Sequence, residues 1–164
     1  MILDEYKWYS AAGELVSIED IIEDIKIAYK NNKATEIHVG TDSDPNGDKY
    51  ANATGIAIRF PGKGCRYYWT RTYLDPYTHN SLIIRLNAEV TQTIFIADAL
   101  RKKINDTHPI SVHIDCNPDP KHNSGKYIKQ LKSYAAGMGF NVIVKPDSWA
   151  ASCIADKHAK KSSL

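Results

Sequence analysis

The pattern of hydrophobic and polar positions predicts helices and strands along the chain. A capping-box sequence, Ser17-Ile18-Glu19-Asp20, precedes isoleucines at helical spacing and predicts a helix that Asn31-Asn32 ends. Alternation with a period of two predicts strands over 37–42, 52–60 and 66–73, separated by turn-forming segments at 44–48 and 61–64. Three successive strands indicate an antiparallel meander.

After the meander, the hydrophobic period becomes that of helices alternating with single strands. We expect a long amphipathic helix over 81–104, a strand over 110–115, a helix over 124–138, a strand over 142–144 and a last helix over 148–161. Helical crossovers join strands in parallel. The sequence therefore predicts an α/β fold with a mixed five-stranded sheet, an antiparallel meander plus parallel strands, flanked by helices.

Length and composition are those of one globular domain. Residues 1–164 are predicted to form a single domain with a helical extension over about 1–33. Hydrophobic residues make up 43% and charged residues 24%, which excludes disordered and fibrous classes. The net charge is only +2, yet residues 1–50 carry 5 basic and 11 acidic side chains, a net charge of −6. The rest of the chain is correspondingly basic, so the two signs are segregated.

The sequence shows no sign of export or of disulfide chemistry. It has no run of about 18 apolar residues and no basic stretch before an apolar run at its start, so we expect a cytoplasmic protein that does not span a membrane. Cys65, Cys116 and Cys153 are odd in number, far apart and without a C-x-x-C pair. This pattern favours buried free thiols over a disulfide framework or a thiolate zinc site.

Two acidic residues stand at the ends of predicted strands. Asp42 is expected to close the first strand and Asp115 the fourth. Polar or small residues precede each acid on its own face of the strand, namely His38, Gly40, Ser111 and His113. Because ligands of open α/β sheets gather outside the carboxyl ends of the strands, these two acids are the first candidates for chemistry. The histidines have no zinc-ligand spacing, so we expect them to be structural.

Carboxylates this close together would repel each other unless a cation lay between them. Hard divalent cations such as Mg²⁺ or Mn²⁺ prefer oxygen ligands, and a pair of such ions can serve both oxygens of a phosphodiester displacement. Further acids are available in Glu89 on the long helix and Asp156 on the last helix, where Asp156 shares a stripe with Trp149, Ser152, Cys153 and Lys160. The alternative is that these acids are ordinary surface charges.

At these residues the sequence resembles the ribonuclease H superfamily. The likeness rests on the element order and on Thr41-Asp42-Ser43, Asn87-Ala88-Glu89, Asp115 and Ala155-Asp156-Lys157-His158-Ala159. It implies a two-metal site in which Asp42 bridges two Mg²⁺ or Mn²⁺ ions, Glu89 and Asp115 complete one ion's site, and Asp156 holds the second ion. It also implies a nucleic-acid partner.

More narrowly, the chain resembles the YkuK-like branch of predicted ribonuclease H-related nucleases. This likeness rests on Val39-Gly40-Thr41-Asp42-Ser43, His113-Ile114-Asp115 and the segment 145–156. One departure concerns the mobile histidine that ribonuclease H proper often carries before its last helix, because 145–149 contains none. His158 lies two residues after Asp156 and is expected on a different helix face.

Lysines are concentrated near the carboxyl end of the chain. Residues 121–164 contain eight lysines and two acids, and Lys126, Lys129 and Lys132 recur along one edge of a predicted helix. With Lys160 they could contact a nucleic-acid backbone. The alternative is a solvated helix face.

The function predicted from the sequence is a divalent-metal-dependent nuclease that hydrolyses phosphodiester bonds in RNA, an RNA/DNA hybrid or another nucleic acid. One alternative is a noncatalytic relative that binds nucleic acid or protein. A weaker alternative is calcium binding, because Asp42, Asp44, Asn46, Gly47 and Asp48 copy the first half of a calcium loop, although position twelve is Ala53 rather than Glu.

Overall fold

The computed structural model describes residues 3–105, 108–116 and 125–160. The strands are β1 (Trp8–Ser10), β2 (Leu15–Val16), β3 (Glu36–Asn46), β4 (Lys49–Phe60), β5 (Gly64–Leu74), β6 (Ile110–Ile114) and β7 (Asn141–Val144). The helices are η1 (Leu3–Glu5), α1 (Ile18–Asn31), α2 (Leu82–Ile104), α3 (Gly125–Gly137), η2 (Ala150–Ala155) and α4 (Asp156–Ala159). This order confirms the predicted succession of a meander followed by alternating helices and strands.

The strands form one mixed sheet in the order β2-β1-β5-β4-β3-β6-β7. The meander β3-β4-β5 is antiparallel, whereas β6 pairs in parallel with β3, and β7 with β6. The predicted five strands are therefore confirmed, and two more extend the sheet to seven.

The two additional strands come from the segment expected to be a helical extension. The strand β1 has only three residues and β2 two, which is too short to show a period-two pattern. Trp8 of β1 is buried, and its indole N–H donates to the Leu3 carbonyl at 2.9 Å. The indole N–H of Trp69 on β5 donates to the Ser10 carbonyl. The pairing of β1 with the distant strand β5, rather than local propensity, creates the extra strands.

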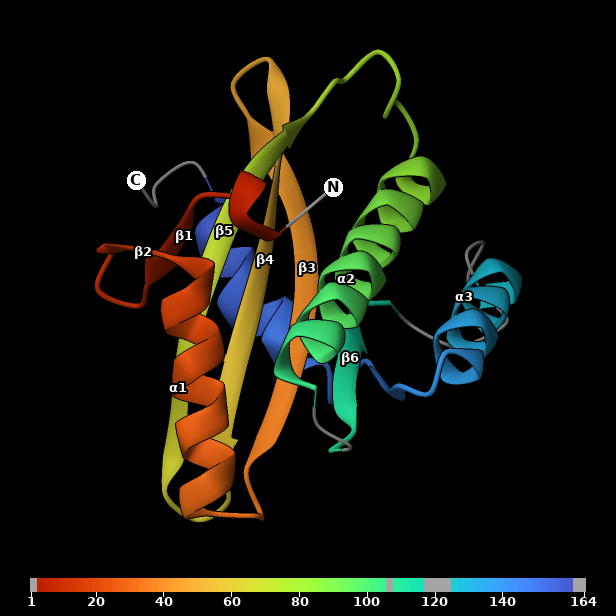
Figure 1. Ribbon diagram of the computed structural model, residues 1–164. Helices are drawn as coiled ribbons and strands as arrows, with labels where there is room; N and C mark the ends of the chain where they lie inside the picture. Colours follow the sequence, from red (N-terminus) through yellow and green to blue (C-terminus); the bar gives the residue numbers. More distant parts are fainter. Residues whose placement is uncertain (1–2, 106–107, 117–124, 161–164) are drawn as a thin grey trace.

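The sheet has a helical layer on each face. In Figure 1, α1 and α2 cover the near face, and the chain that follows β7 crosses behind the sheet. The main hydrophobic core lies under α1 and α2, and it includes Ile37 and Val39 of β3. Ser17 caps α1 in a capping box, as predicted. The opposite face receives η2 and α4, which pack on β3 and β4.

The strand β3 is longer than its pattern predicts. It runs to Asn46 and pairs with β4 up to the turn at Gly47, whose φ is 65°. Asp42 therefore lies inside a strand and does not close it, while Asp115 comes directly after β6, one residue past the end of the strand. The calcium-loop interpretation is wrong, because Asp42, Asp44 and Asn46 belong to a regular antiparallel ladder.

The last helical segment begins as a π-helix rather than the predicted α-helix. The amide of Asp156 donates to the carbonyl of Ala151, five residues earlier, which is π-helical bonding. Cys153 is exposed, whereas Ala151 and Ala155 are buried. The residues predicted to share one face with Asp156 from α-helical spacing therefore do not all face the same way.

Two paired glycines allow this segment to approach the sheet. Gly40 on β3 pairs with Gly55 on β4. A Cβ atom on Gly40 would lie 2.6 Å from the Ala151 nitrogen, and one on Gly55 would lie 2.5 Å from Ile154 Cγ2. The absence of both side chains therefore sets the distance between the sheet and η2.

We predict that Gly40→Ala lowers the free energy of unfolding by about 1–3 kcal/mol, because the added methyl group overlaps a helix backbone that cannot move away without losing its own packing. Urea unfolding would measure the change. Gly137→Ala is the control, since no atom lies within 4 Å of the Cβ it would add. Its effect should be neutral or stabilising by less than about 1 kcal/mol. Equal stability of wild type and Gly40→Ala would contradict the tight contact.

Candidate functional site

A cluster of threonines fixes α2 against the sheet next to Glu89. The Thr93 hydroxyl on α2 donates to Thr41 Oγ1 on β3 at 2.7 Å, and it also lies 2.9 Å from the Glu89 carbonyl. Thr41 and Thr54 share a hydrogen bond of 2.8 Å, and the Gln92 amide donates to Thr54 at 3.0 Å. These hydrogen bonds attach one turn of α2 to β3 and β4, and they thereby fix the distance of Glu89 from the sheet.

Three of the four acids predicted from the sequence line one cavity of about 380 Å³. They come from three elements: Asp42 from β3, Glu89 from α2, and Asp115 from the residue after β6. Glu89 is only 9% exposed. The remaining lining includes Ser43, Tyr50, Arg85, Cys116 and Lys145. The expectation that folding brings Asp42, Glu89 and Asp115 together is met.

The fourth acid, Asp156, lies on the first residue of α4 and does not line this cavity. It acts on the site through Asp42, since its interaction with the Asp42 carboxyl group helps to raise the pKa of Asp42. Its Oδ2 atom is 2.9 Å from Lys160 Nζ. Asp156 is therefore beside the cluster rather than inside the cavity.

The cluster is electrostatically unfavourable when it holds only carboxyl groups. Burial raises the pKa of Asp42 to about 9, and the charge of Glu89, the contact with Asp156 and the charge of Asp115 add to the effect. Burial also raises the pKa of Glu89 to about 7, although hydrogen bonds from Ser43 act in the opposite direction. At neutral pH the cluster therefore retains protons unless cations replace them.

Several polar partners of these acids were not predicted from the sequence. The Ser43 amide donates to Glu89 Oε1 at 2.9 Å, and the Ser148 hydroxyl lies 3.4 Å from Asp115 Oδ1. Lys145 Nζ is 3.7 Å from the same Asp115 oxygen. A signal for Lys145 was available, because it follows β7 just as Asp115 follows the neighbouring parallel strand β6.

The donor set suits a hard cation, although its side chains are turned to other partners. Within residues 3–105, 108–116 and 125–160, no three His, Cys, Asp or Glu side chains form a ready group of metal ligands. Glu89 is bonded to Ser43, and Asp115 faces Lys145. The oxygens that remain are carboxylate oxygens, which Mg²⁺ and Mn²⁺ prefer. The chemistry of the donors thus fits such ions.

Of the predicted lysines, Lys129 and Lys132 lie on α3 and Lys160 follows α4. Burial raises the pKa of Cys116 in the cavity to about 12, whereas the charges of Lys145 and Lys132 oppose that rise, so both lysines act on the cavity. Lys129 is exposed on α3, and Lys160 is paired with Asp156. The side chain of Lys126 lies outside the described part of the structure.

The prediction for His158 is confirmed. Its ring is buried and stacks on Trp69 with the ring centroids 4.0 Å apart. Tyr67 on β5 contacts its Nε2 atom. His158 therefore faces β5, whereas Asp156 contacts Asp42 on β3. The three cysteines are free, as predicted, but only Cys116 is buried, whereas Cys65 and Cys153 are exposed.

The fold and the acidic cavity define an α/β protein of the ribonuclease H type, with acids on a central strand, on the helix after the meander and at the end of the next strand. A family model described as Ribonuclease H-like matches residues 18–160, and the chain belongs to this family. No curated protein and no solved structure matches the chain. The family supports a nuclease-like or nucleic-acid-related function.

We predict that Asp42→Asn raises stability at pH 8 in buffer containing a chelator. The folded pKa of Asp42 lies above its unfolded value of 3.8, so the native state holds a proton that the unfolded state releases. Wild-type stability should therefore fall as pH rises from about 4 towards 9, whereas Asp42→Asn avoids that loss. Since one pKa unit is worth about 1.4 kcal/mol, we expect a gain of at least about 1 kcal/mol.

Chemical unfolding between pH 5 and pH 9 would measure this gain. Asp48→Asn, which neutralises an exposed carboxylate at the β3–β4 turn, is the control and should follow the wild-type curve. If the free energies of unfolding of the wild type and Asp42→Asn differ by the same amount at every pH in that range, the repulsion within the acidic cluster does not depend on Asp42.

Proposed function

We propose that the protein is a divalent-metal-dependent nuclease of the YkuK-like branch, which hydrolyses phosphodiester bonds in a nucleic acid. The observation that carries the proposal is the convergence of Asp42, Glu89 and Asp115 on one cavity, with Asp156 against Asp42. Mutual repulsion between buried carboxyl groups destabilises the fold, and bound cations would neutralise that repulsion. Membership of the ribonuclease H-like family supports the same chemistry.

Asp42, Glu89, Asp115 and Asp156 would hold two Mg²⁺ or Mn²⁺ ions, which when bound supply an activated water and neutralise charge on the phosphate. Asp42 and Glu89 must lose their protons before they can act as ligands. Ser43 would orient Glu89 through its amide, which already donates to one carboxylate oxygen. Lys145 would leave Asp115 and turn to the phosphate backbone.

The substrate is a nucleic acid contacted mainly through its backbone. Arg85 and Lys145 line the cavity, and Lys132 lies close enough to act on Cys116 in its wall. Cations of this kind bind phosphates without reading bases, so RNA, DNA and hybrid substrates all suit the site. Lys126, Lys129 and Lys160 are proposed as outer backbone contacts.

The second candidate is a noncatalytic nucleic-acid-binding or protein-binding relative. The ion pairs Lys145–Asp115 and Lys160–Asp156 favour it, because internal cations already neutralise two of the four acids. Such a protein would bind its partner in a salt-dependent manner and would need no Mg²⁺ or Mn²⁺. Activity measurements separate the two candidates.

We predict that the wild type cleaves at least one labelled substrate among RNA, RNA/DNA hybrid, single-stranded DNA and branched DNA in the presence of Mn²⁺. Asp42→Asn and Glu89→Gln should each lower the rate at least about 100-fold, because even residues that only support metal ligands are worth about 10- to 100-fold. Gel assays with and without chelator would measure the rates.

Asp48→Asn is the matched control for these assays, since it removes a carboxylate of the same hairpin outside the cavity, and it should cleave at the wild-type rate. Equal cleavage by wild type and Asp42→Asn would refute the catalytic role. Binding without cleavage on every substrate would favour the noncatalytic relative.

We also predict that Lys132→Ala and Lys145→Ala weaken nucleic-acid binding at low salt and each reduce the salt slope by about one, as expected for loss of one phosphate contact. Fluorescence anisotropy over a salt series would measure both effects, with Asp42→Asn as the background so that the substrate stays intact. Lys26→Ala on α1 is the control and should bind as the background protein does. Unchanged salt slopes in both variants would show that neither lysine contacts the phosphate backbone of the nucleic acid.

A further inference from the structure

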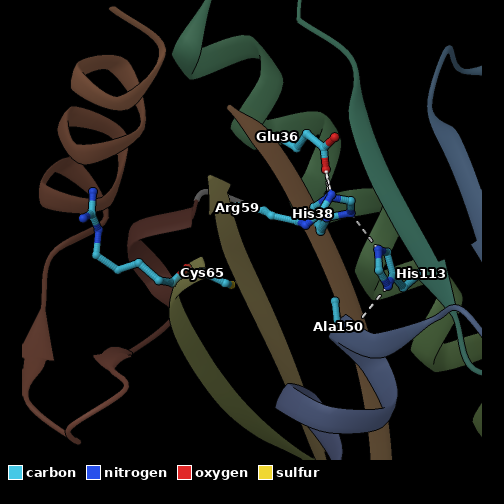
Figure 2. A network of polar contacts seen from close by, with 7 residues as sticks. Glu36, His38, Arg59, Cys65, His113 and Ala150 are labelled. Carbon is cyan, nitrogen blue, oxygen red and sulfur yellow. Dashed lines mark hydrogen bonds and ion pairs between the residues drawn. The ribbon is translucent and has the colours of Figure 1, made fainter. Parts of the chain in front are cut away.

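Two buried histidines connect β3 to the start of the last helical segment. Figure 2 shows the line of contacts from Glu36 through His38 and His113 to Ala150. The Ala150 amide donates to His113 Nδ1 at 3.0 Å, and His113 Nε2 lies 2.8 Å from His38 Nδ1. His38 Nε2 lies 2.9 Å from Glu36 Oε1. His38 is 5% exposed and His113 is 1% exposed.

The Ala150 amide sets the direction of the hydrogen bonds along this line. The Ala150 amide can only donate, so His113 Nδ1 carries no proton and His113 Nε2 carries one. His113 Nε2 therefore donates to His38 Nδ1, which leaves the His38 proton on Nε2 for the Glu36 carboxylate. Burial lowers the pKa of both rings, that of His113 to about 3, although a main-chain hydrogen bond with Ser148 acts in the opposite direction on His113. Arg59 also donates to Glu36, at 2.8 Å, and holds that carboxylate charged.

His113 supplies a cap that the sequence before the helix does not provide. The first amides of a helix have no partner within the helix, and they normally bond to a side chain just before it. Trp149 is the residue before η2, and it makes no side-chain cap. An imidazole from β6 takes this role, and the Trp149 ring packs against both imidazoles, with centroids 4.8 Å from His38 and 5.1 Å from His113.

The capped amide is at the point where the helix meets the sheet. Ala150 and Ala151 contact Gly40, and a Cβ on Gly40 would lie 2.9 Å from the Ala150 carbonyl carbon. Asp156 begins the α4 segment six residues later and contacts Asp42, two residues after Gly40 on the same strand. A shift of the helix along β3 would therefore separate the two carboxyl groups.

We propose that His113 is a positioning residue for the acidic site, with its tautomer set by His38 and Glu36, and that its bond to Ala150 holds Asp156 against Asp42. This inference rests on the proposed function for its effect on metal binding. The hydrogen bonds of the two rings and of Ala150 do not depend on that function. The role of His113 and the proposed function can therefore be tested separately.

Two substitutions divide the roles of the His113 ring. In His113→Asn, the side-chain oxygen occupies the place of Nδ1 and can still accept from Ala150. In His113→Gln, the side-chain nitrogen occupies the place of Nε2 and can still donate to His38, but no acceptor faces Ala150. Both variants remove the ring that packs against Trp149, so the Asn variant is a matched control for loss of the ring.

The first measurement needs no metal. Long-range ¹H–¹⁵N spectra of the wild type should show the proton of both rings on Nε2, and a protonated His113 Nδ1 at neutral pH would overturn the proposal. Amide hydrogen exchange over 150–156 should be at least about 10-fold faster in His113→Gln than in His113→Asn, because only the Gln variant leaves Ala150 without its acceptor. Equal exchange in the two variants would also overturn it.

The second measurement is Mn²⁺ binding by calorimetry. His113→Gln should weaken the affinity for Mn²⁺ about 10-fold relative to His113→Asn, as expected for residues that orient ligands. In an Asp156→Asn background the two variants should bind Mn²⁺ equally, because the carboxylate that they position is gone. A difference that persists without Asp156 would overturn the positioning role. If the wild type binds no Mn²⁺, the proposed function fails, while the spectra and the exchange rates still decide the role of His113.

Discussion

The site depends on one close contact, that of η2 with the glycine pair Gly40 and Gly55. Because neither glycine carries a side chain, the helix backbone meets the sheet directly, and Asp156 is carried to the side of Asp42. The other face of the sheet has the opposite character, since its isoleucines and valines form the main core with α1 and α2. The face under α1 and α2 therefore holds the main core, and the acidic site combines Glu89 from α2 on that face with Asp156 from α4 on the opposite face.

The acids are held together against their own repulsion by neutral hydrogen bonds. The threonines around Thr93 fix α2, and the imidazole of His113 fixes the start of η2, so neither anchor adds a charge to the cluster. Lys145 and Lys160 supply positive charge from the rim, where a polyanion or a metal ion can replace it. Neutral groups thus hold the acids in place, and the charges that neutralise the acids can be exchanged. Such an arrangement suits a site whose carboxylates change partners during a reaction.

The sequence predicts those features of the fold that local periodicity specifies. The capping box at Ser17, the long helix that carries Glu89 and the succession of strands along the chain follow from spacing alone, and the position of Asp115 at the end of β6 follows from the geometry of α/β sheets. Features that need tertiary contacts were missed: β1 and β2, the continuation of β3 past Asp42, and the π-helical turn before Asp156. The roles of His38 and His113 could not be predicted from the pattern either, because the contact of His113 with the Ala150 amide and with His38 exists only in the folded chain.

The contact between Gly40 and Ala150 joins residues about 110 positions apart, whereas the β3-β4-β5 meander joins near neighbours. Local hairpins form faster than contacts that close long loops, so the meander is expected early in folding and the docking of the final helix late. Until that docking occurs, Asp42 lacks the Asp156 carboxyl group as a neighbour and suffers less repulsion. We therefore expect Asp156 to join Asp42 late in folding, and protons or metal ions bound at that stage would lower the electrostatic cost of bringing the two carboxyl groups together.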